Sequence, residues 1–236
     1  MANCKRTDLA MESREMIRES AKDTSDIEGV EAREYDRNGC RVIHVKILNE
    51  KGAQILEKPV GSYVTIEVTG LMRREQEAFG HAVCAVAEEM KHLMSPDRLQ
   101  GVLLAGLGNR DITPDAIGPK VMQSCIVTRH LVDKMPDEFG HMRPVAAIIP
   151  GVLGTTGMES AEIIKGAIDS MKPQLVVIVD ALTSRRASRL CSTVQISDSG
   201  IVPGSGVGNA RAALNHETLG VPVISVGVPT VHILQV

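Results

Sequence analysis

Two aspartates follow apolar segments, and their side chains are suited to hydrolysis. Asp180 directly follows the apolar run Leu175–Val179, and Asp115 lies in the glycine-rich segment after Val102–Leu104. A carboxylate just beyond a buried strand is costly unless it is paired or used. When neighbouring loops bring two carboxylates together, one stays ionised and activates water, while the other keeps a proton and polarises a carbonyl. We interpret Asp115 and Asp180 as a catalytic pair for general acid–base hydrolysis, which needs neither a metal nor a covalent intermediate.

Each aspartate also has a structural interpretation. The segment Thr113-Pro114-Asp115 resembles a helix entry, where Thr113 or Asp115 could simply cap the helix, because a carboxylate favours its positive end. Asp180 could be a structural acid that is neutralised by a nearby arginine. Three arginines follow it closely, namely Arg185, Arg186 and Arg189. The residues alone leave these alternatives open.

A second glycine-rich segment could supply hydrogen-bond donors to the same site. Residues 149–159 (IPGVLGTTGME) leave an apolar run and enter an expected helix near Thr156. Backbone N–H groups in such a loop can hold a peptide carbonyl or an oxyanion, so Gly154, Thr155 and Thr156 are candidate substrate-binding residues. A turn followed by a helix cap explains the same residues at least as well.

Other catalytic motifs and binding classes lack support. There is no G-x-S-x-G, HExxH or P-loop motif. The seven histidines show no ligand spacing and the five cysteines form no C-x-x-C pair, so we predict no metal and no cofactor. A net charge of −3 and a chain with two Phe, two Tyr and no Trp argue against nucleic acid as a partner. Since no apolar run could span a bilayer and the polar start is no signal peptide, we expect no membrane contact and a cytoplasmic location.

Apolar runs that alternate with helical stretches predict the elements that position these residues. Continuous apolar strands separated by helices are typical of a parallel sheet covered on both faces. We therefore expect an α/β fold, an α/β/α sandwich with a mostly parallel sheet. The expected strands are Val102–Leu104, Val145–Ile149, Leu175–Val179 and Val223–Val228, and the expected helices are 72–94, 117–135, 157–171 and 208–219.

The N-terminal part has a different pattern. Residues 5–26 predict a short helix or a loosely held arm. Alternating apolar residues in Arg41–Leu48 and Ser62–Val68 predict antiparallel strands joined by a long loop or flap. We expect a single domain over residues 1–236, with a hairpin-like flap region at 40–70 and a catalytic α/β core at 98–236. A short strand at Thr193–Ile196 is expected at an edge or in a subdomain.

Several long motifs resemble the germination protease family of spore-forming bacteria. They are GLGNRDITPDAIGP at 106–119, VVIVDAL at 176–182 and SDSGIVPGSGVGNARAALNHETLGVPVISVGVPT at 197–230. The start RTDLAMESRE at 6–15 also matches. The likeness covers nearly the whole chain. It implies a phosphorylase/hydrolase-like fold similar to that of the hydrogenase maturation proteases.

The resemblance also implies a function. This family comprises atypical aspartic endopeptidases (family A25) that degrade the small acid-soluble spore proteins at germination. Their proposed catalytic aspartates fall on Asp115 and Asp180 here. Members are made in the developing spore as inactive homotetrameric precursors that remove their own N-terminal propeptide. The candidate propeptide here ends between residues 8 and 15, with cleavage expected within Arg6–Ala10 and placed between Asp8 and Leu9.

Two further expectations come with the resemblance. Family members continue well beyond the motif SVGVPTV, whereas this chain stops after His232-Ile-Leu-Gln-Val236, so we expect a C-terminally shortened member. Because the substrates are cut at sites that contain glutamate, we also expect at least one of the arginines after Asp180 to bind a substrate carboxylate. A solvated loop or a subunit salt bridge is the alternative role for Arg185, Arg186 and Arg189.

Two other functions remain open at this point. One is a processing peptidase of the hydrogenase-maturation type, which uses a metal on its substrate, although its metal-site histidine has no evident counterpart here. The other is an inactive binding homologue, which the shortened C-terminus makes plausible.

Overall fold

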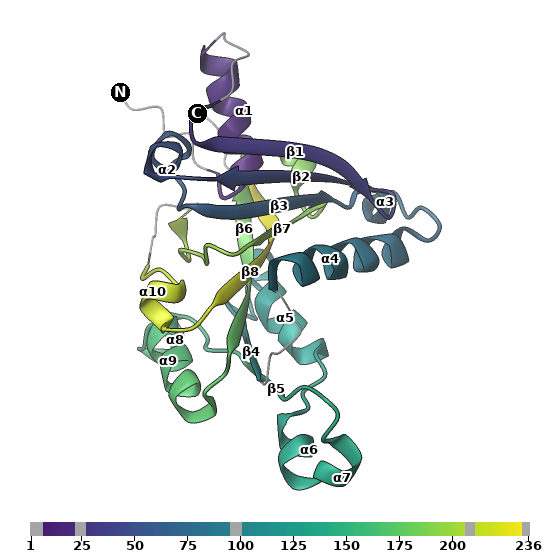
Figure 1. The fold of residues 1–236 in the computed structure, drawn as a ribbon, viewed down its shortest axis with the longest axis vertical. Helices are drawn as coiled ribbons and strands as arrows, with labels where there is room; N and C mark the ends of the chain where they lie inside the picture. Colours follow the sequence, from purple (N-terminus) through teal and green to yellow (C-terminus); the bar gives the residue numbers. More distant parts are fainter. Residues whose placement is uncertain (1–6, 22–26, 95–100, 206–210, 233–236) are drawn as a thin grey trace.

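The computed structural model describes residues 7–21, 27–94, 101–205 and 211–232. The described strands form one eight-stranded sheet in the order β1-β2-β3-β7-β8-β6-β4-β5 (Figure 1). They are β1 (Val30–Arg37), β2 (Cys40–Ile47), β3 (Gly61–Glu67), β4 (Val102–Gly106), β5 (Val145–Ile148), β6 (Leu175–Ser184), β7 (Thr193–Ser197) and β8 (Val223–His232).

Helices lie on both faces of this sheet. They are α1 (Ala10–Ala21), α2 (Glu50–Leu56), α3 (Thr69–Met72), α4 (Ala78–Met94), α5 (Ile117–Ser124), α6 (Arg129–Lys134), α7 (Pro136–Phe139), α8 (Leu153–Thr156), α9 (Ser160–Met171) and α10 (His216–Leu219). Two 3-10 turns, η2 (Thr113–Asp115) and η3 (Ala187–Arg189), follow β4 and β6. In the described part of the chain, no helix is long and apolar enough to cross a membrane.

The sheet has a parallel and an antiparallel part, and the predicted α/β fold is confirmed. The strands β5, β4, β6 and β8 pair in parallel, as their continuous apolar runs predicted. From β8 onward the pairing is antiparallel through β7, β3, β2 and β1. The alternating pattern of the two N-terminal segments therefore predicted antiparallel strands correctly.

Two details of the expected arrangement change. The strand expected at an edge, β7, lies in the interior, hydrogen-bonded to β3 on one side and β8 on the other. The shortness of this strand suggested an edge, but its polar residues Thr193, Gln195 and Ser197 are buried and hydrogen-bonded in the interior. Residues 40–70 contain β2, α2 and β3, and both strands have neighbours on each side. This region is therefore part of the sheet rather than a flap over it.

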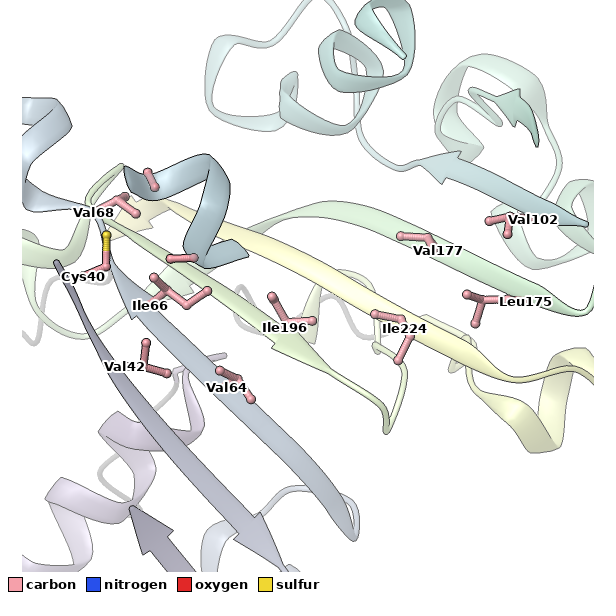
Figure 2. Close-up of a cluster of buried hydrophobic side chains, with 12 residues drawn as sticks. Cys40, Val42, Val64, Ile66, Val68, Val102, Leu175, Val177, Ile196 and Ile224 are labelled. Atoms are coloured by element: carbon pink, nitrogen blue, oxygen red, sulfur yellow. The ribbon is translucent and has the colours of Figure 1, made fainter. Parts of the chain in front are cut away.

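Apolar burial on both faces explains why β6 lies in the interior of the parallel part. Val177 belongs to a cluster that includes Val102, Leu175 and Ile224, shown in Figure 2, and this cluster extends under α4. Val176 and Ile178 point to the other face, where the α9 residues Ile164 and Ile168 and the β4 residue Leu103 cover them. Each such side chain contributes about 1.5–3 kcal/mol when it is fully buried.

Three predicted helices differ in extent. The helix expected at 72–94 begins at Ala78, because Arg74 and Glu77 adopt positive φ between α3 and α4. The helix expected at 117–135 is divided into α5 and α6, since Cys125 is extended. Of the helix expected at 208–219, residues 208–210 lie outside the described residues and α10 covers only His216–Leu219.

The N-terminal helix is firmly packed rather than loosely held. Leu9 is fully buried, and with Met11 it joins a cluster that includes Val45, Leu56 and Leu182. In Figure 1, α1 and α4 lie on opposite sides of the layer formed by β1, β2 and β3. The chain ahead of α1 thus runs along the face of β6 that carries Leu182.

Two glycines let α5 lie directly on the ends of β4 and β6. A Cβ at Gly118 would lie 2.2 Å from the carbonyl oxygen of Leu107 and 2.6 Å from that of Val179. A Cβ at Gly106 would lie 2.3 Å from the carbonyl oxygen of Gly118. All of these obstructing atoms belong to the backbone, which has little freedom to move aside.

The substitution Gly118→Ala should therefore lower the free energy of unfolding by about 3 kcal/mol. Gly166→Ala is a matched control, because Gly166 lies in α9 with nothing within 4 Å of an added Cβ. The control should raise the free energy of unfolding by about 0.5–1 kcal/mol through helix propensity alone. Urea unfolding measures both, and equal effects of the two changes would contradict the close packing of α5.

Candidate active site

Asp180 is buried inside a strand. The strand β6 continues for four residues beyond it, so our expectation that this aspartate lies just past a strand end is wrong. The pairing of β6 with β8 places it opposite Gly227 and keeps the strand extended to Ser184. The side chain is 6% exposed, and its Oδ1 accepts a hydrogen bond of 2.8 Å from the N–H of Ala181.

Burial controls the charge of Asp180. Loss of solvation raises the pKa of this carboxyl group to about 7, while the hydrogen bond from the Ala181 N–H acts in the opposite direction. The negative charges of Asp115 and Asp8 raise the pKa further. Asp180 is therefore an acid that holds a proton close to neutral pH, which is the behaviour required of a general acid.

Asp115 lies at the end of η2, immediately before α5. Its Oδ2 accepts a hydrogen bond of 2.6 Å from the N–H of Asn109. A Cβ at Gly108, whose φ is +106°, would lie 2.8 Å from Asp115 Oδ1, so the loop closes around the carboxylate only with glycine there. Burial raises the pKa of Asp115, and the Asn109 N–H opposes that shift.

The two structural alternatives for the aspartates are not supported by these contacts. The N-cap of α5 is Ala116, without a side-chain cap, and the Asp115 carboxylate binds the N–H of Asn109 in its own loop. The three arginines after Asp180 form ion pairs with glutamates of α1 instead of with Asp180. These pairs are Arg185 with Glu19 at 3.0 Å, Arg186 with Glu19 at 3.1 Å, and Arg189 with Glu12 at 2.9 Å and Glu15 at 2.7 Å.

Asp115 and Asp180 line one pocket, which we call the aspartate pocket. Apolar side chains from the neighbouring loops, among them Ile112 and Leu153, line it as well. Arg185, Arg186 and Arg189 are not among its lining residues. The predicted pair is thus placed together, next to an apolar surface that suits a peptide side chain.

The glycine-rich loop after β5 borders the pocket through residues other than those predicted. Gly151, Val152 and Leu153 line the aspartate pocket, whereas Gly154, Thr155 and Thr156 do not. The N–H groups of Thr155 and Thr156 both donate to the carbonyl oxygen of Val152, at 2.9 and 3.0 Å. These two groups are therefore occupied inside the loop and do not point to an oxyanion.

The N-terminal segment enters the same site. Asp8 lines the aspartate pocket, and its Oδ2 accepts hydrogen bonds from the N–H and the hydroxyl of Thr183, at 2.8 and 2.7 Å. Its Oδ1 accepts a hydrogen bond of 2.9 Å from the hydroxyl of Ser205. The expected cleavage position between Asp8 and the buried Leu9 is therefore beside Asp180.

A second pocket adjoins the first and shares Asp8 and Asp180 with it. Lys58 and Gln195 line this adjoining pocket. Burial lowers the pKa of Lys58, whose Nζ donates to the carbonyl oxygen of Thr7 at 3.1 Å, while the charge of Asp8 opposes that shift. Lys58, Thr183 and Gln195 were not among the residues predicted from the sequence. The one available signal was polarity inside apolar strands, which Thr183 and Gln195 both show.

The site provides acidic, amide and hydroxyl groups. Within residues 7–21, 27–94, 101–205 and 211–232, no group of three or more His, Cys, Asp and Glu side chains is placed to hold a metal ion. The arrangement can hold a peptide main chain, keep one carboxyl group protonated, and leave a second one available as a base.

Comparison with known proteins gives the family. The model of the family described as "Germination protease" matches residues 10–234. The chain is 48% identical over 227 residues to the germination protease of Caldanaerobacter subterraneus subsp. tengcongensis, covering 96% of this chain and 68% of the relative. It is 45% identical to that of Clostridium tetani and 47% identical to that of Clostridium perfringens, each covering 96% of this chain and 70% of the relative.

One solved structure shows a weaker likeness. The nickel–iron hydrogenase maturation protease HycI from Thermococcus kodakarensis is 22% identical, with a TM-score of 0.39, covering 60% of this chain and 80% of that one. That score adds nothing to the fold described above. The family model and the relatives are sufficient by themselves: the chain belongs to the germination protease family of peptidases.

Proposed function

We propose that the chain is an endopeptidase of the atypical aspartic type, in which Asp115 and Asp180 act together on a peptide bond. The observation that carries this proposal is the buried Asp180, with a pKa of about 7, lining one pocket with Asp115. Asp180 holds the proton and donates it in a hydrogen bond to the carbonyl oxygen. Asp115 accepts a proton from water as the water oxygen bonds to the carbonyl carbon. The C–N bond then breaks, and the amine leaves with the proton that Asp115 took from water, so both aspartates return to their starting states.

The substrates in this proposal are the small acid-soluble spore proteins, degraded at germination in the spore core. We also infer that the chain is made as a homotetrameric precursor, as its family resemblance implies. The contacts of the N-terminal segment support a self-activating precursor, because Asp8 lies in the aspartate pocket. While this segment is bound, it occupies the position of a substrate. Cleavage between Asp8 and Leu9 would release it.

The arginines remain a proposed substrate-binding group with an added condition. Each of them is paired with a glutamate of α1 in this structure. We propose that these glutamates occupy the positions that substrate carboxylates would take, so that a substrate reaches the arginines only after α1 moves. Guanidinium groups suit bidentate binding of a carboxylate.

Replacing either aspartate should abolish most cleavage. Asp115→Asn and Asp180→Asn should each slow digestion of a small acid-soluble spore protein, and the appearance of a new N-terminus at Leu9, by about 10²–10⁴-fold. Asp111→Asn is the control, since Asp111 is an exposed carboxylate in the same loop as Asp115. Gel analysis and N-terminal sequencing measure both reactions. If both variants cut as fast as the wild type, the mechanism is wrong.

Stability should also depend on the proton of Asp180. Between about pH 4 and pH 7 the folded chain keeps a proton that the unfolded chain has lost, so the free energy of unfolding falls as pH rises, by about 1.4 kcal/mol per unit. Above pH 7 this contribution is constant. Asp180→Asn removes this pH dependence. From pH 5 to pH 8, the free energy of unfolding of the variant should therefore rise by about 2–3 kcal/mol relative to that of the wild type. Urea unfolding at both pH values measures this, with Asp169→Asn on the surface of α9 as control.

The arginine proposal has a separate test. Arg185→Ala, Arg186→Ala and Arg189→Ala are compared on a peptide with glutamate near the cleaved bond and on the same peptide with glutamine. At least one variant should lose the preference for glutamate, by about 3–10-fold for a charge-assisted hydrogen bond. Arg129→Ala, at an exposed position of α6, is the control. An unchanged preference in all three variants would rule the arginines out.

A further inference from the structure

Gln195 and Asp180 lie in one row across the sheet. Gln195 on β7 is paired with Gly227 on β8, and Gly227 is paired with Asp180 on β6. Residues paired directly across strands point to the same face of a sheet. Two strand spacings separate the Cα atoms of Gln195 and Asp180, about 10 Å. Both residues line the adjoining pocket, with only a glycine between them in the row.

The side-chain amide of Gln195 binds main-chain atoms on both sides of Leu9. Its Nε2 donates to the carbonyl oxygen of Asp8 at 3.0 Å, and its Oε1 accepts from the N–H of Ala10 at 2.9 Å. One residue of a parallel strand bonds in the same way to the residues that flank its partner. The amide of Gln195 thus holds the main chain at the entry to α1 with the two hydrogen bonds that a neighbouring parallel strand would form.

These contacts do not depend on the side chains of the bound segment. They involve only a carbonyl oxygen and an N–H, which nearly every peptide offers. Gln195 is 7% exposed, and a buried amide is costly without hydrogen-bond partners. Once the N-terminal segment leaves, as the proposed function requires, the Gln195 amide is free to form the same two hydrogen bonds with another main chain in that position.

We propose that Gln195 binds the main chain of the peptide substrate across the bond to be cleaved. Its Nε2 donates to the carbonyl oxygen of that bond, and its Oε1 accepts from the N–H two residues further on. This inference rests on the proposed function and adds a residue to it. The bound N-terminal segment, with Asp8 and Leu9 on either side of the expected cleavage position, shows the geometry that the substrate adopts.

Gln195 then has an effect on the reaction as well as on binding. When the water oxygen bonds to the carbonyl carbon, negative charge develops on the carbonyl oxygen, which Gln195 Nε2 contacts. A fixed donor at such an oxygen stabilises the transition state more than the ground state. A neutral amide supplies this donor without a cation that would keep Asp180 ionised.

The first experiment tests the contact without any cleavage. Amide-resolved hydrogen exchange is compared in the full chain carrying Asp180→Asn, with and without Gln195→Ala. Exchange of the Ala10 N–H should become at least 10-fold faster in the double variant. The Leu9 N–H, which donates to the hydroxyl of Thr7, is the internal reference for loosening of the segment as a whole. If hydrogen exchange accelerates equally at the Ala10 and Leu9 N–H groups, or does not accelerate at Ala10, the direct contact is ruled out.

The second experiment tests the role toward a substrate. The full chain is allowed to process itself and is then given a peptide with the sequence of residues 5–15, KRTDLAMESRE, or the same peptide with an ester in place of the Leu–Ala amide. The ester removes the N–H that Gln195 Oε1 would bind. It should lower kcat/KM about 3–10-fold in the wild type and have no effect in Gln195→Ala.

Gln195→Ala should itself lower kcat about 10²–10³-fold on the amide peptide, as loss of an oxyanion donor does. Gln123→Ala, an exposed glutamine of α5, is the control. If the ester lowers kcat/KM equally in the wild type and in Gln195→Ala, the proposal is overturned, because the N–H would then bind elsewhere. If the wild type cuts neither peptide while the exchange result holds, the proposed function fails, and Gln195 is only an anchor for the N-terminal segment.

Discussion

Asp180 places a carboxyl group inside a hydrogen-bonded strand of the sheet. The free-energy cost of burying this group determines the properties of the rest of the site. Ionisation at such a position is unfavourable, because burial removes the water that would solvate the charge. The single hydrogen bond from the Ala181 N–H offsets only part of this cost. The three arginines that follow Asp180 in sequence do not compensate this cost, since they are paired with glutamates of α1. The result is an acid whose pKa is about 7.

The N-terminal segment supplies hydrogen-bond partners to polar groups of β6 and β7 that face the site. Thr183 exchanges hydrogen bonds with Asp8, and Gln195 binds the chain on both sides of Leu9. The ion pairs between α1 and the loop after β6 hold this segment in place from the other end. A short stretch ahead of the first helix thus satisfies polar groups from β6 and β7 at once. In the function proposed above, a peptide substrate would bind the same groups.

Much of the fold could be predicted from the sequence, and less of the site. The continuous apolar run before Asp180 predicted a buried parallel strand, because such runs have no polar face. The lengths of local elements were less predictable, as the break at Cys125 shows. Residue type and position singled out Asp115 and Asp180, and the two line one pocket. Gln195 was not, because its partners Asp8 and Ala10 lie about 185 residues earlier in the chain, and no local pattern reports such a contact.

The strand order has a consequence for how the chain folds during synthesis. The strands β7 and β8 lie between the N-terminal strands β1 to β3 and the strands β4 to β6, although they are made after both groups. The edge of β3 stays unpaired until β7 has left the ribosome, and the edge of β6 until β8 has left it, so the row from Gln195 to Asp180 is completed last. Pairings this distant in sequence form late in folding. A nascent chain therefore carries its N-terminal segment and both aspartates before the sheet that positions them is complete.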